Sequence, residues 1–541
     1  MTKIFIFNNA SNAAGYGIGT YVKQLSEGIS SAPETIVSLV EMHADTKEFY
    51  VHVDDLGMYH FLIPQMGSGI ESEAYCRCIF YFLARNIEVD CSDKLVFQFN
   101  YFQHYPLALL LKGWQPSCII IFTVHYMNWC FELKGNVHRM REIISEGYVP
   151  NDDMEKRVIY SFNNERTFLH FADIVFVLSQ SSKDILTSDY VVSQNKIHLV
   201  YNGIGNEVSK NLQQRNRDAR NILYVGRLDN DKGLSYLISA FIQIADKYPN
   251  TNLIIVGDGD FRPYIEQSRK ILGRVIFLGK IDKNEIDKLY HSAYIGALPS
   301  FHEQCSYTVI EMMRHGLPIV GTDAIGLKDM LDKTPDLQVH IKEGEIDERD
   351  FVSQIVSCLN MLLSDQTAYR LAFETVLTQY KERYTLSAMI NKILHAIQSF
   401  LFNGDSFIAL DYLRHIDDRM IDLINKRPDI SMDFYGQGGI GVYLWWRILQ
   451  MKKAASTDAE QIALLQEHLI YYLDWVCESV YQEQIPVELI KTLHSMKEHS
   501  FYPMKVDQIL ELDRTTRTDS GGMPSEKSIL MNALKICTCK I

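Results

Sequence analysis

Hydrophobic residues follow two alternating patterns along roughly the first 400 residues of the chain. Short continuous apolar runs, mostly of four to six residues, alternate with longer segments whose apolar positions recur every three or four residues. The short runs are typical of parallel strands covered on both faces, and the longer segments are typical of amphipathic helices. Strands are predicted at 4–7, 95–99, 119–124, 174–178, 222–225, 253–256, 275–278, 296–299 and 319–321, and helices at 19–30, 234–246 and 386–401.

Alternating strands and helices predict an α/β fold built from doubly wound, Rossmann-like domains with parallel sheets. The alternation occurs twice, so we expect one domain at 1–201 and a second at 221–384, joined by the polar, aperiodic linker 202–220 and facing each other across a cleft. A helix at 385–401 is expected to cross back to the first domain. Strand-like runs become scarce after it, so residues 402–541 are predicted to form a helical accessory domain.

The charge balance narrows the class of function. The 541 residues include 67 acidic and 53 basic ones, which gives a net charge of -14. A nucleic-acid-binding protein needs a basic face to neutralise phosphates, so no nucleic-acid partner is expected. The composition leaves room for a local basic pocket that holds one small anion.

The start of the chain and its cysteines indicate a compartment. The opening MTKIFIFNN lacks the apolar stretch of a signal peptide, and the most apolar region, 105–126, is interrupted by Lys112 and Pro116. Ten cysteines are scattered along the chain, and the C-x-C pairs at 76/78 and 537/539 lack companions at zinc-site spacing. We therefore expect a cytoplasmic protein with free thiols and no transmembrane segment, with peripheral attachment to the inner face of a membrane left open.

Ligands of doubly wound sheets bind where loops leave the carboxyl ends of the strands, and a glycine-rich loop follows the first predicted strand. Gly15, Gly17 and Gly19 open a helix there, so the backbone can approach an anion or a hydroxyl group. The spacing differs from the dinucleotide-binding fingerprint, and an ordinary glycine-rich turn remains the alternative.

A second loop, 226–233, follows the strand at 222–225 and carries Arg227 and Lys232 between Gly226 and Gly233. A planar guanidinium and a compact ammonium on one glycine-bounded loop are suited to a diphosphate. The alternative is a solvated loop with two surface cations.

Two carboxylates eight residues apart mark a third loop. Glu303 follows the strand at 296–299, and Glu311 lies two turns into a helix that is expected to open at 304–306 and to end at Gly316. Sugar hydroxyls favour carboxylate acceptors, and free backbone N–H groups at a helix start can serve hydroxyls and phosphate oxygens. Glu311 interrupts apolar positions, so it should have a hydrogen-bonded or cationic partner. A solvated pair of glutamates is the alternative.

His125 ends the strand at 119–124 in the first domain. A lone histidine is often structural, but the carboxyl end of a parallel strand is also where ligands bind, so both interpretations stay open.

The stretch 224–323, with YVGRL, LIIVGDGD, FLGKI and LPSFHEQCSYTVIEMMRHGLPIVGTD, resembles the C-terminal domain of family 4 retaining nucleotide-sugar glycosyltransferases, which have the GT-B fold. The glycine loop, Thr123-Val-His125 and the segments 172–179 and 200–204 are similar to the N-terminal domain and linker of that family. The resemblance covers roughly residues 1–400.

The resemblance implies a role for each motif. Arg227 and Lys232 would hold the donor diphosphate, Glu303 the sugar hydroxyls and Glu311 the ribose, while His125 would contact the sugar near its anomeric carbon. The catalytic residues implied are His125, Arg227, Lys232 and Glu303. The donor-binding residues implied are Gly17, Gly19, Gly226, Arg227, Lys232, Gly257, Lys280, Ile281, Glu303, Gln304, Cys305, Ser306, Tyr307 and Glu311.

The run Gln304-Cys305-Ser306-Tyr307 departs from the family, which often has glycine and a bulky residue directly after the first glutamate. Donor identity is therefore open, with a UDP-sugar favoured over a GDP-sugar. No metal and no further cofactor are expected, because Arg227 and Lys232 can neutralise the diphosphate.

The expected reaction is retaining transfer of a hexose or N-acetylhexosamine to a glycan, lipid-linked or peptide acceptor, with residues 127–163 shaping the acceptor mouth. A sugar-nucleotide epimerase and a catalytically silent nucleotide-sugar-binding protein are the alternatives. In the accessory domain, the glycine-rich run 435–446 weakly resembles helix starts of lanthionine-cyclase-like repeats, without their zinc residues. Glycines that let helices pack closely are the alternative. That domain is expected to bind an acceptor or a protein partner, with Trp445 and Trp446 as anchors.

Overall fold

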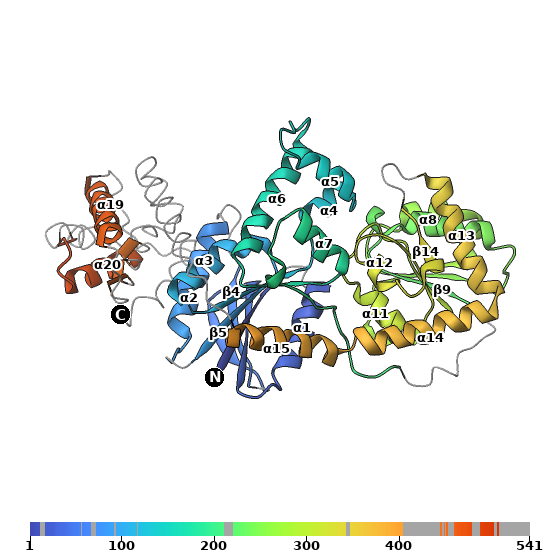
Figure 1. Ribbon diagram of the computed structural model, residues 1–541, viewed down its shortest axis with the longest axis horizontal. Helices are drawn as coiled ribbons and strands as arrows, with labels where there is room; N and C mark the ends of the chain where they lie inside the picture. Colours follow the sequence, from blue (N-terminus) through green and yellow to red (C-terminus); the bar gives the residue numbers. More distant parts are fainter. Residues whose placement is uncertain are drawn as a thin grey trace, which may run out of the picture. The chain divides into compact units, whose positions relative to one another are not determined.

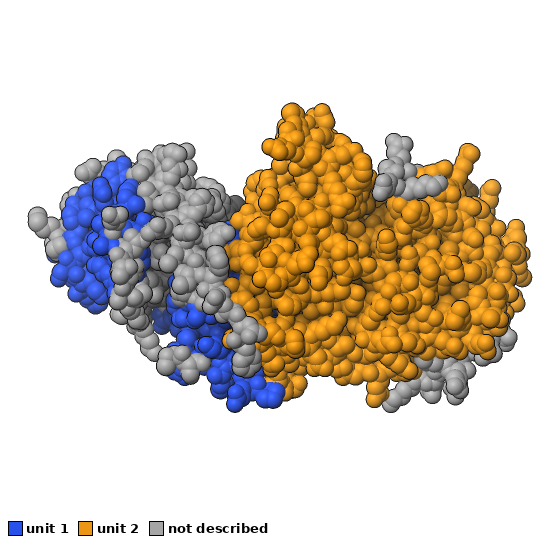
Figure 2. Space-filling view, viewed as in Figure 1, with its two compact units in different colours: residues 1–15, 33–120, 405–541 blue, residues 16–32, 121–404 orange. Residues whose placement is uncertain are grey.

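The computed structural model describes residues 1–10, 17–55, 57–65, 72–90, 93–115, 117–209, 220–341, 347–403, 444–445, 448–449, 451–452, 459–478, 487–502 and 506–507. The chain divides into two compact units (Figure 2). Unit 1 comprises residues 1–15, 33–120 and 405–541, and unit 2 comprises residues 16–32 and 121–404. The strands form two sheets, β1–β8 and β9–β14.

Among its described residues, unit 1 contains five strands in the order β3-β4-β2-β1-β5. Strand β1 pairs in parallel with β2 and β5, whereas β3 and β4 form an antiparallel pair. The rings of Phe7 and Phe99 stack with centroids 4.4 Å apart, because neighbouring parallel strands place equivalent side chains side by side. The elements are β1 (Thr2–Asn9), β2 (Thr35–Ala44), β3 (Tyr50–Val53), β4 (Tyr59–Pro64), α2 (Ser72–Asn86), β5 (Lys94–Phe99), η2 (Phe102–His104) and α3 (Tyr105–Trp114).

The first part of unit 2 pairs β6, β7 and β8 in parallel. Between β6 and β7 the chain forms an arm of three helices, α4, α5 and α6, whose last two extend above the strands (Figure 1). The elements are α1 (Gly17–Ile29), β6 (Ile119–Val124), α4 (Asn128–Leu133), α5 (Val137–Ile143), α6 (Asp153–Phe171), β7 (Ile174–Val177), α7 (Gln180–Ser188), η3 (Gln194–Lys196) and β8 (Ile197–Leu199).

The second sheet lies wholly within unit 2 and has the strand order β11-β10-β9-β12-β13-β14, with every pair parallel. Helices cover it, with α8 beside α13 and α11 beside α14 (Figure 1). The strands are β9 (Ile222–Val225), β10 (Leu253–Val256), β11 (Val275–Gly279), β12 (Ile295–Leu298), β13 (Ile319–Thr322) and β14 (Gln338–Val339). The helices are η5 (Asn230–Lys232), α8 (Leu234–Ile244), α9 (Arg262–Gln267), η6 (Arg269–Arg274), α10 (Lys283–Ser292), α11 (Tyr307–Arg314), α12 (Leu327–Met330), η7 (Pro335–Leu337), α13 (Glu348–Ser364) and α14 (Gln366–Arg383).

Helix α15 (Leu386–Asn403) follows α14 and packs on α1 through its apolar face. Ile390 fits against Gly28 so closely that a Cβ at residue 28 would lie 2.5 Å from Ile390 Cδ1. The helix therefore returns from the second sheet to an element of the predicted first domain, within unit 2.

Helices α19 (Ala459–Glu478) and α20 (Val487–Glu498) belong to the C-terminal region of unit 1. Trp445 is buried there, and its indole N–H donates a 3.1 Å hydrogen bond to Ser495 Oγ. This tryptophan stabilises the helical region and is not an exposed anchor as the sequence suggested. Residues 435–443 and Trp446 lie outside the described residues.

Two α/β domains with parallel sheets and a helical C-terminal region confirm the predicted fold class. In the described part of the chain, no helix is both long and apolar enough to cross a bilayer, and no three metal-ligating side chains gather at one point. Six cysteines whose side chains the structure describes are buried and form no disulfide: Cys76, Cys78, Cys118, Cys130, Cys305 and Cys358.

Candidate functional site

The loop that follows β9 carries the two predicted cations. Lys232 ends the short helix η5, and the next residue, Gly233, has a φ of +66°. A Cβ at residue 233 would lie 2.1 Å from the Pro299 carbonyl oxygen, so only glycine lets this loop approach the end of β12. Phe301 N–H then donates to the Asp231 carbonyl at 2.9 Å, which ties the two loops together.

Lys232 and Glu303 meet where those loops join. Lys232 Nζ donates to Glu303 Oε1 at 2.5 Å, and the side chains are only 16% and 15% exposed. Arg227 lies elsewhere: it pairs with Asp229 at 3.1 Å, and its side chain is 54% exposed. The structure therefore joins Lys232 to Glu303 rather than to Arg227.

The Glu303 loop rests on Gly326, which follows β13. Gly326 has a φ of +78°, and a Cβ there would lie 2.2 Å from the Glu303 carbonyl oxygen and 2.5 Å from that of Gln304. Glu303 N–H also donates to the Ile325 carbonyl at 3.1 Å. The position of Glu303 is thus set by a backbone contact that no larger residue at 326 allows.

Helix α11 begins directly after this loop, with Ser306 as its N-cap and no side-chain hydrogen bond capping its first turn. Glu311 lies one turn inside the helix, and Tyr290 Oη donates to Glu311 Oε2 at 2.9 Å. Burial raises the pKa of Glu311, and the Tyr290 hydrogen bond partly offsets that effect. The partner expected for this carboxylate is therefore a tyrosine hydroxyl in the protein itself.

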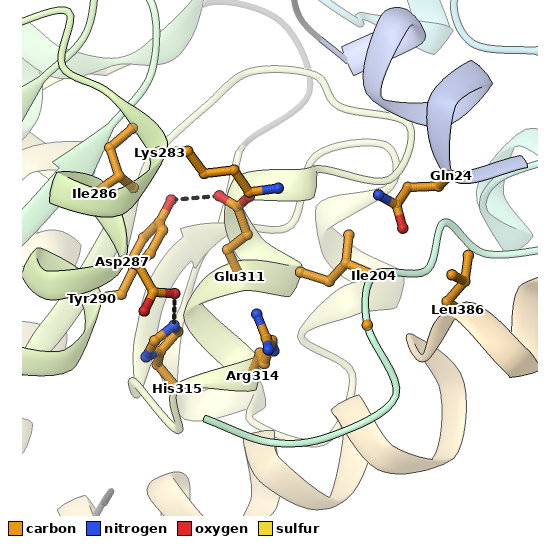
Figure 3. Close-up of a pocket in the computed structure, with 11 residues that line it drawn as sticks. Gln24, Ile204, Lys283, Ile286, Asp287, Tyr290, Glu311, Arg314, His315 and Leu386 are labelled. Atoms are coloured by element: carbon orange, nitrogen blue, oxygen red, sulfur yellow. Dashed lines mark hydrogen bonds and ion pairs between the residues drawn. The ribbon is translucent and has the colours of Figure 1, made fainter. Parts of the chain in front are cut away.

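A pocket of about 280 Å³ opens beside Glu311 (Figure 3). Gln24 of α1 extends toward it, and Arg314 of α11 lies at its floor, where Arg314 Nε donates to the Glu207 carbonyl at 3.0 Å. Asp287 is held by the His315 ring at 3.0 Å. The lining residues are Gln24, Ile204, Gly205, Lys283, Ile286, Asp287, Tyr290, Glu311, Arg314, His315 and Leu386.

His125, which follows β6, and Gly17, which begins α1, are the predicted site residues from the N-terminal part of the chain. The His125 ring packs edge-on against Tyr21, with centroids 4.6 Å apart, and Tyr21 Oη lies 3.2 Å from Thr123 Oγ1. Burial lowers the pKa of His125 to about 3, so the imidazole is neutral at physiological pH. A Cβ at Gly17 would meet open space, so packing does not require glycine at the helix start.

The loops after β9 and β10 also come together. Gly257 has a φ of +150°, and a Cβ there would lie 1.8 Å from the Gly226 carbonyl oxygen. Lys280 is exposed and Ile281 is partly buried at the end of β11, and neither lines the pocket beside Glu311. Residues 226, 257, 280 and 281 therefore share one edge of the sheet but not that pocket.

Gln304 and Cys305 face the protein interior. Ser182 Oγ donates to Gln304 Oε1, and Asn202 Nδ2 donates to the Cys305 carbonyl at 2.7 Å. Burial raises the pKa of the Cys305 thiol to about 12, so it is not a nucleophile at neutral pH. The Gln304 side chain and the Cys305 backbone carbonyl therefore hold the loop.

Solved structures with the same arrangement decide the fold. Sucrose-phosphate synthase from Thermosynechococcus elongatus is 18% identical, with a TM-score of 0.57 over 74% of this chain and 99% of that one. The catalytic domain of starch synthase IV from Arabidopsis thaliana, bound to ADP and acarbose, is 15% identical, with a TM-score of 0.52 over 74% and 99%. The fold is GT-B.

Within this GT-B chain, residues 219–361 match the family model described as glycosyl transferases group 1. An uncharacterized glycosyltransferase from Methanocaldococcus jannaschii is 33% identical over 172 residues, which cover 29% of this chain and 44% of the relative. The chain spans less than two thirds of the length of the first curated relatives that it matches. Lys232, Glu303 and Glu311 all lie inside the group 1 segment.

The helical arm touches the group 1 segment just before Glu303. The Phe131 ring packs edge-on against His302 with centroids 5.2 Å apart, and a Cβ at Gly135 would lie 2.9 Å from the Phe301 carbonyl oxygen. Phe131 remains 48% exposed. Glu165 anchors the arm by accepting hydrogen bonds from Asn128 N–H at 2.7 Å and from Tyr190 Oη at 2.5 Å.

Sequence reasoning missed several residues of this GT-B site, above all Tyr290, Gln24 and Arg314. Tyr290 lies in the last turn of α10, a mostly polar helix, and sequence reasoning gave it no role of its own. Gln24 and Arg314 line the pocket together with Ile204, but they lie 180 and 110 residues away from it in the chain. They belong to two helices, α1 and α11, that only the fold brings together. The arm contact likewise depends on the backbone conformation at Gly135, for which the sequence offers no signal beyond the glycine itself.

Proposed function

We propose that this chain is a retaining glycosyltransferase that transfers a hexose or N-acetylhexosamine from a nucleotide-diphosphate sugar, preferably a UDP-sugar, to a hydroxyl or peptide side-chain acceptor. The match of residues 219–361 to the group 1 glycosyl transferases supports the reaction class. The ADP bound to the starch synthase IV domain supports a nucleoside diphosphate as the group that the fold accommodates.

The contact between Lys232 and Glu303 carries the proposal. In a nucleotide sugar, the bond that breaks joins the sugar to the distal phosphate. A group that accepts hydrogen bonds from sugar hydroxyls must therefore lie next to a group that neutralises the phosphate. The Glu303 carboxylate and the Lys232 ammonium meet this requirement at one point, and both keep some exposure to a ligand.

Glu311 and the pocket beside it supply the nucleoside side of the site. The Glu311 oxygen that Tyr290 does not occupy can accept from the ribose hydroxyls. Neutral His125 can hydrogen-bond the sugar without adding a positive charge near the anomeric carbon. Its low pKa makes it unsuited to act as a general acid at neutral pH.

The proposed step needs no nucleophile from the protein. The bond between the anomeric carbon and the phosphate oxygen breaks, and the acceptor oxygen bonds to the same face of that carbon. The acceptor proton passes to the leaving phosphate oxygen, and Lys232 stabilises the charge that develops there. The protein therefore positions the two substrates and stabilises the charge on the leaving phosphate. The helical arm, on which Phe131 is exposed, forms the acceptor side of the site.

A panel of UDP-, ADP- and GDP-sugars tests the proposal. A true donor at about 100 times its dissociation constant should raise the free energy of unfolding by roughly 2.7 kcal/mol in a thermal shift experiment. Hydrolysis of this donor should also release nucleoside diphosphate and a free sugar. Proton NMR should show that the sugar first appears with the same anomeric configuration as in the donor. Release of the inverted anomer would exclude retention, and release of an epimerised sugar would favour an epimerase.

A further inference from the structure

Helix α4 joins two parts of the structure that lie far apart in the chain. On one side, Glu165 of α6 accepts hydrogen bonds from the backbone N–H and the side-chain amide of Asn128, the first residue of α4, at 2.7 and 2.6 Å. On the other side, the turn after α4 fits the Glu303 loop so closely that a Cβ at Gly135 would lie 2.9 Å from the Phe301 carbonyl oxygen. We call α4 docked when it makes both contacts.

The carboxyl group of Glu165 is completely buried, and Tyr190 Oη lies 2.5 Å from its Oε2. Burial raises the pKa of Glu165 to about 7, although the hydrogen bonds from Tyr190 and Asn128 lower it. The hydrogen bonds do not require the charge, because Oε1 can accept from Asn128 in either form and a protonated Oε2 can donate to the Tyr190 oxygen. The docked arrangement therefore accommodates a neutral carboxyl group better than an ionised one.

Other titratable groups around this carboxyl group belong to the elements that pack against it. Burial raises the pKa of the Cys130 thiol on α4 and that of Tyr190 after α7 well above their usual values, so both stay neutral near pH 7. The Tyr190 carbonyl lies 2.9 Å from the ring of His170 on α6, and the neighbouring Asp189 is paired with Arg141 at 2.9 Å. An exposed histidine can change charge between pH 5 and 8, so His170 needs a control of its own.

Protonation and docking are linked. Once α4 moves away and water reaches Glu165, the pKa of this residue returns toward its ordinary 4.5, so the docked arrangement binds the proton more tightly. Raising the pH from 4.5 through about 7 therefore disfavours docking, and the effect levels off above that range because both arrangements are then ionised. We propose that Glu165 is a positioning residue: when protonated it holds α4 against the Glu303 loop, and when ionised it lets α4 separate from that loop. The consequence for turnover rests on the proposed glycosyltransferase function.

Hydrogen exchange of the α4 amides tests the docking without any substrate. Mass spectrometry of a peptide spanning 128–136 compares the parent with Glu165→Gln at pH 5, 6, 7 and 8. The glutamine keeps the shape and both contacts but cannot ionise. Because the intrinsic exchange of this peptide is the same in both proteins, the ratio of the parent rate to the variant rate reports docking. It should rise roughly 10- to 100-fold between pH 5 and 8.

Tyr190→Phe moves the same transition in a defined direction. It removes a hydrogen bond that lowers the pKa of Glu165, so the docked carboxyl group should stay protonated to higher pH. Its exchange rate relative to Glu165→Gln should still be rising at pH 8, where that of the parent has levelled off. A transition that stays at the parent's pH would contradict the role of Glu165.

Glu132→Gln and His170→Gln are the controls. Glu132 also ties α4 to α6, through a 2.9 Å ion pair with Arg157, but the hydrogen bonds from Arg157 hold the pKa of Glu132 below its usual value. Both controls should keep the pH dependence of the parent. If His170→Gln abolishes it, or if the ratio of parent to Glu165→Gln is constant or falls with pH, Glu165 does not control docking.

Gly135→Ala connects docking to turnover. Its added Cβ meets the Phe301 carbonyl at a φ of +73°, so docking should weaken roughly 5- to 100-fold. With the nucleotide sugar that the donor panel selects, the kcat of donor hydrolysis relative to the parent should fall roughly 3- to 10-fold between pH 5 and 8. Adding Glu165→Gln to this variant should remove the fall.

Two outcomes separate this proposal from the proposed function. If exchange depends on pH as expected but Gly135→Ala turnover does not, α4 does not position the site, and the proposal is overturned while the proposed function stands. If the parent hydrolyses none of the donors, the proposed function fails, and the exchange experiment still decides whether Glu165 controls docking.

Discussion

Glu303 and Glu311 lie eight residues apart and meet opposite surroundings. Glu303 sits on a loop and forms a 2.5 Å ion pair with Lys232. Glu311 sits in a helix, where burial raises its pKa and its carboxylate accepts a hydrogen bond from the neutral hydroxyl of Tyr290. One carboxylate is held by a charge, and the other is held by a neutral donor.

The difference separates two tasks. A charged pair at the loop can respond to charge that develops during a reaction, because the ammonium is already there. A largely buried carboxylate with a neutral partner keeps a strong tendency to accept hydrogen bonds, since desolvation penalises its charge. We therefore expect changes at the loop to affect turnover and changes in the helix to affect binding.

The largest effect is expected for Lys232→Ala. Removing the cation beside the leaving phosphate should lower kcat on the order of 10²- to 10³-fold, because that charge develops mainly in the transition state. Steady-state donor hydrolysis measures it. Lys288→Ala is the control, since Lys288 forms a 2.5 Å pair with Glu285 on the surface and should leave kcat unchanged. An unchanged kcat in Lys232→Ala would remove the leaving-group role.

A smaller loss is expected for Glu311→Gln, and it should appear in binding. The amide replaces a charge-assisted hydrogen bond to ribose, so nucleoside diphosphate binding should weaken by roughly 1.5–3 kcal/mol. Calorimetry with UDP compares the variant with Glu285→Gln, a substitution on the exposed side of α10. Equal affinity in parent and Glu311→Gln would show that this carboxylate does not contact the nucleotide.

Glu303→Gln should change which donor sugar is used. An amide still hydrogen-bonds hydroxyl groups, but with a donor in place of one acceptor oxygen, so the ratio of kcat/KM between two epimeric donor sugars should shift roughly 3- to 10-fold. Competition between a glucosyl and a galactosyl donor measures this ratio. A uniform loss with both sugars would instead assign Glu303 to holding Lys232.

The smallest expected effect is on stability as a function of pH. The folded protein holds a proton on Glu311 above the ordinary pKa of 4.5, so the free energy of unfolding falls as pH rises from 4.5 through the raised pKa. Glu311→Gln has no titratable group at this position, so it lacks this fall in the free energy of unfolding. Its stability relative to the parent, from urea unfolding, should therefore be greater at pH 8 than at pH 5. The opposite trend would mean that the folded protein favours the ionised carboxylate.

Strands β9, β10, β12 and β13 of the second sheet were predictable because each is a fully buried and largely apolar run, and β9 and β10 match their expected limits. The prediction missed β2, whose buried and partly exposed residues alternate, and the antiparallel pair of β3 and β4, which is mostly partly exposed. Such strands lack a continuous apolar run, so their pairing depends on neighbours that the sequence does not name.

For the site, the motifs located Lys232, Glu303 and Glu311 but not their partners. The two cations of the 226–233 loop look equivalent in sequence, yet the turn at Gly233 directs only Lys232 to Glu303. The sequence predicted that the side chains of Gln304 and Cys305 replace bare backbone at the donor site, whereas the fold turns both inward. These outcomes depend on backbone direction in loops, which spacing alone does not determine.

Gly326 gives the site a vulnerability that a survey of catalytic side chains would overlook. It contacts no ligand in the proposed mechanism, and it is 23 residues from Glu303 in the chain. The backbone of the Glu303 loop nevertheless fills the space that a Cβ at residue 326 would occupy. A random screen for inactive but soluble variants should therefore recover substitutions at this glycine alongside those at the charged residues. A naturally occurring relative with a larger residue here should be suspected of having lost donor binding, even where every charged residue of the motif is intact.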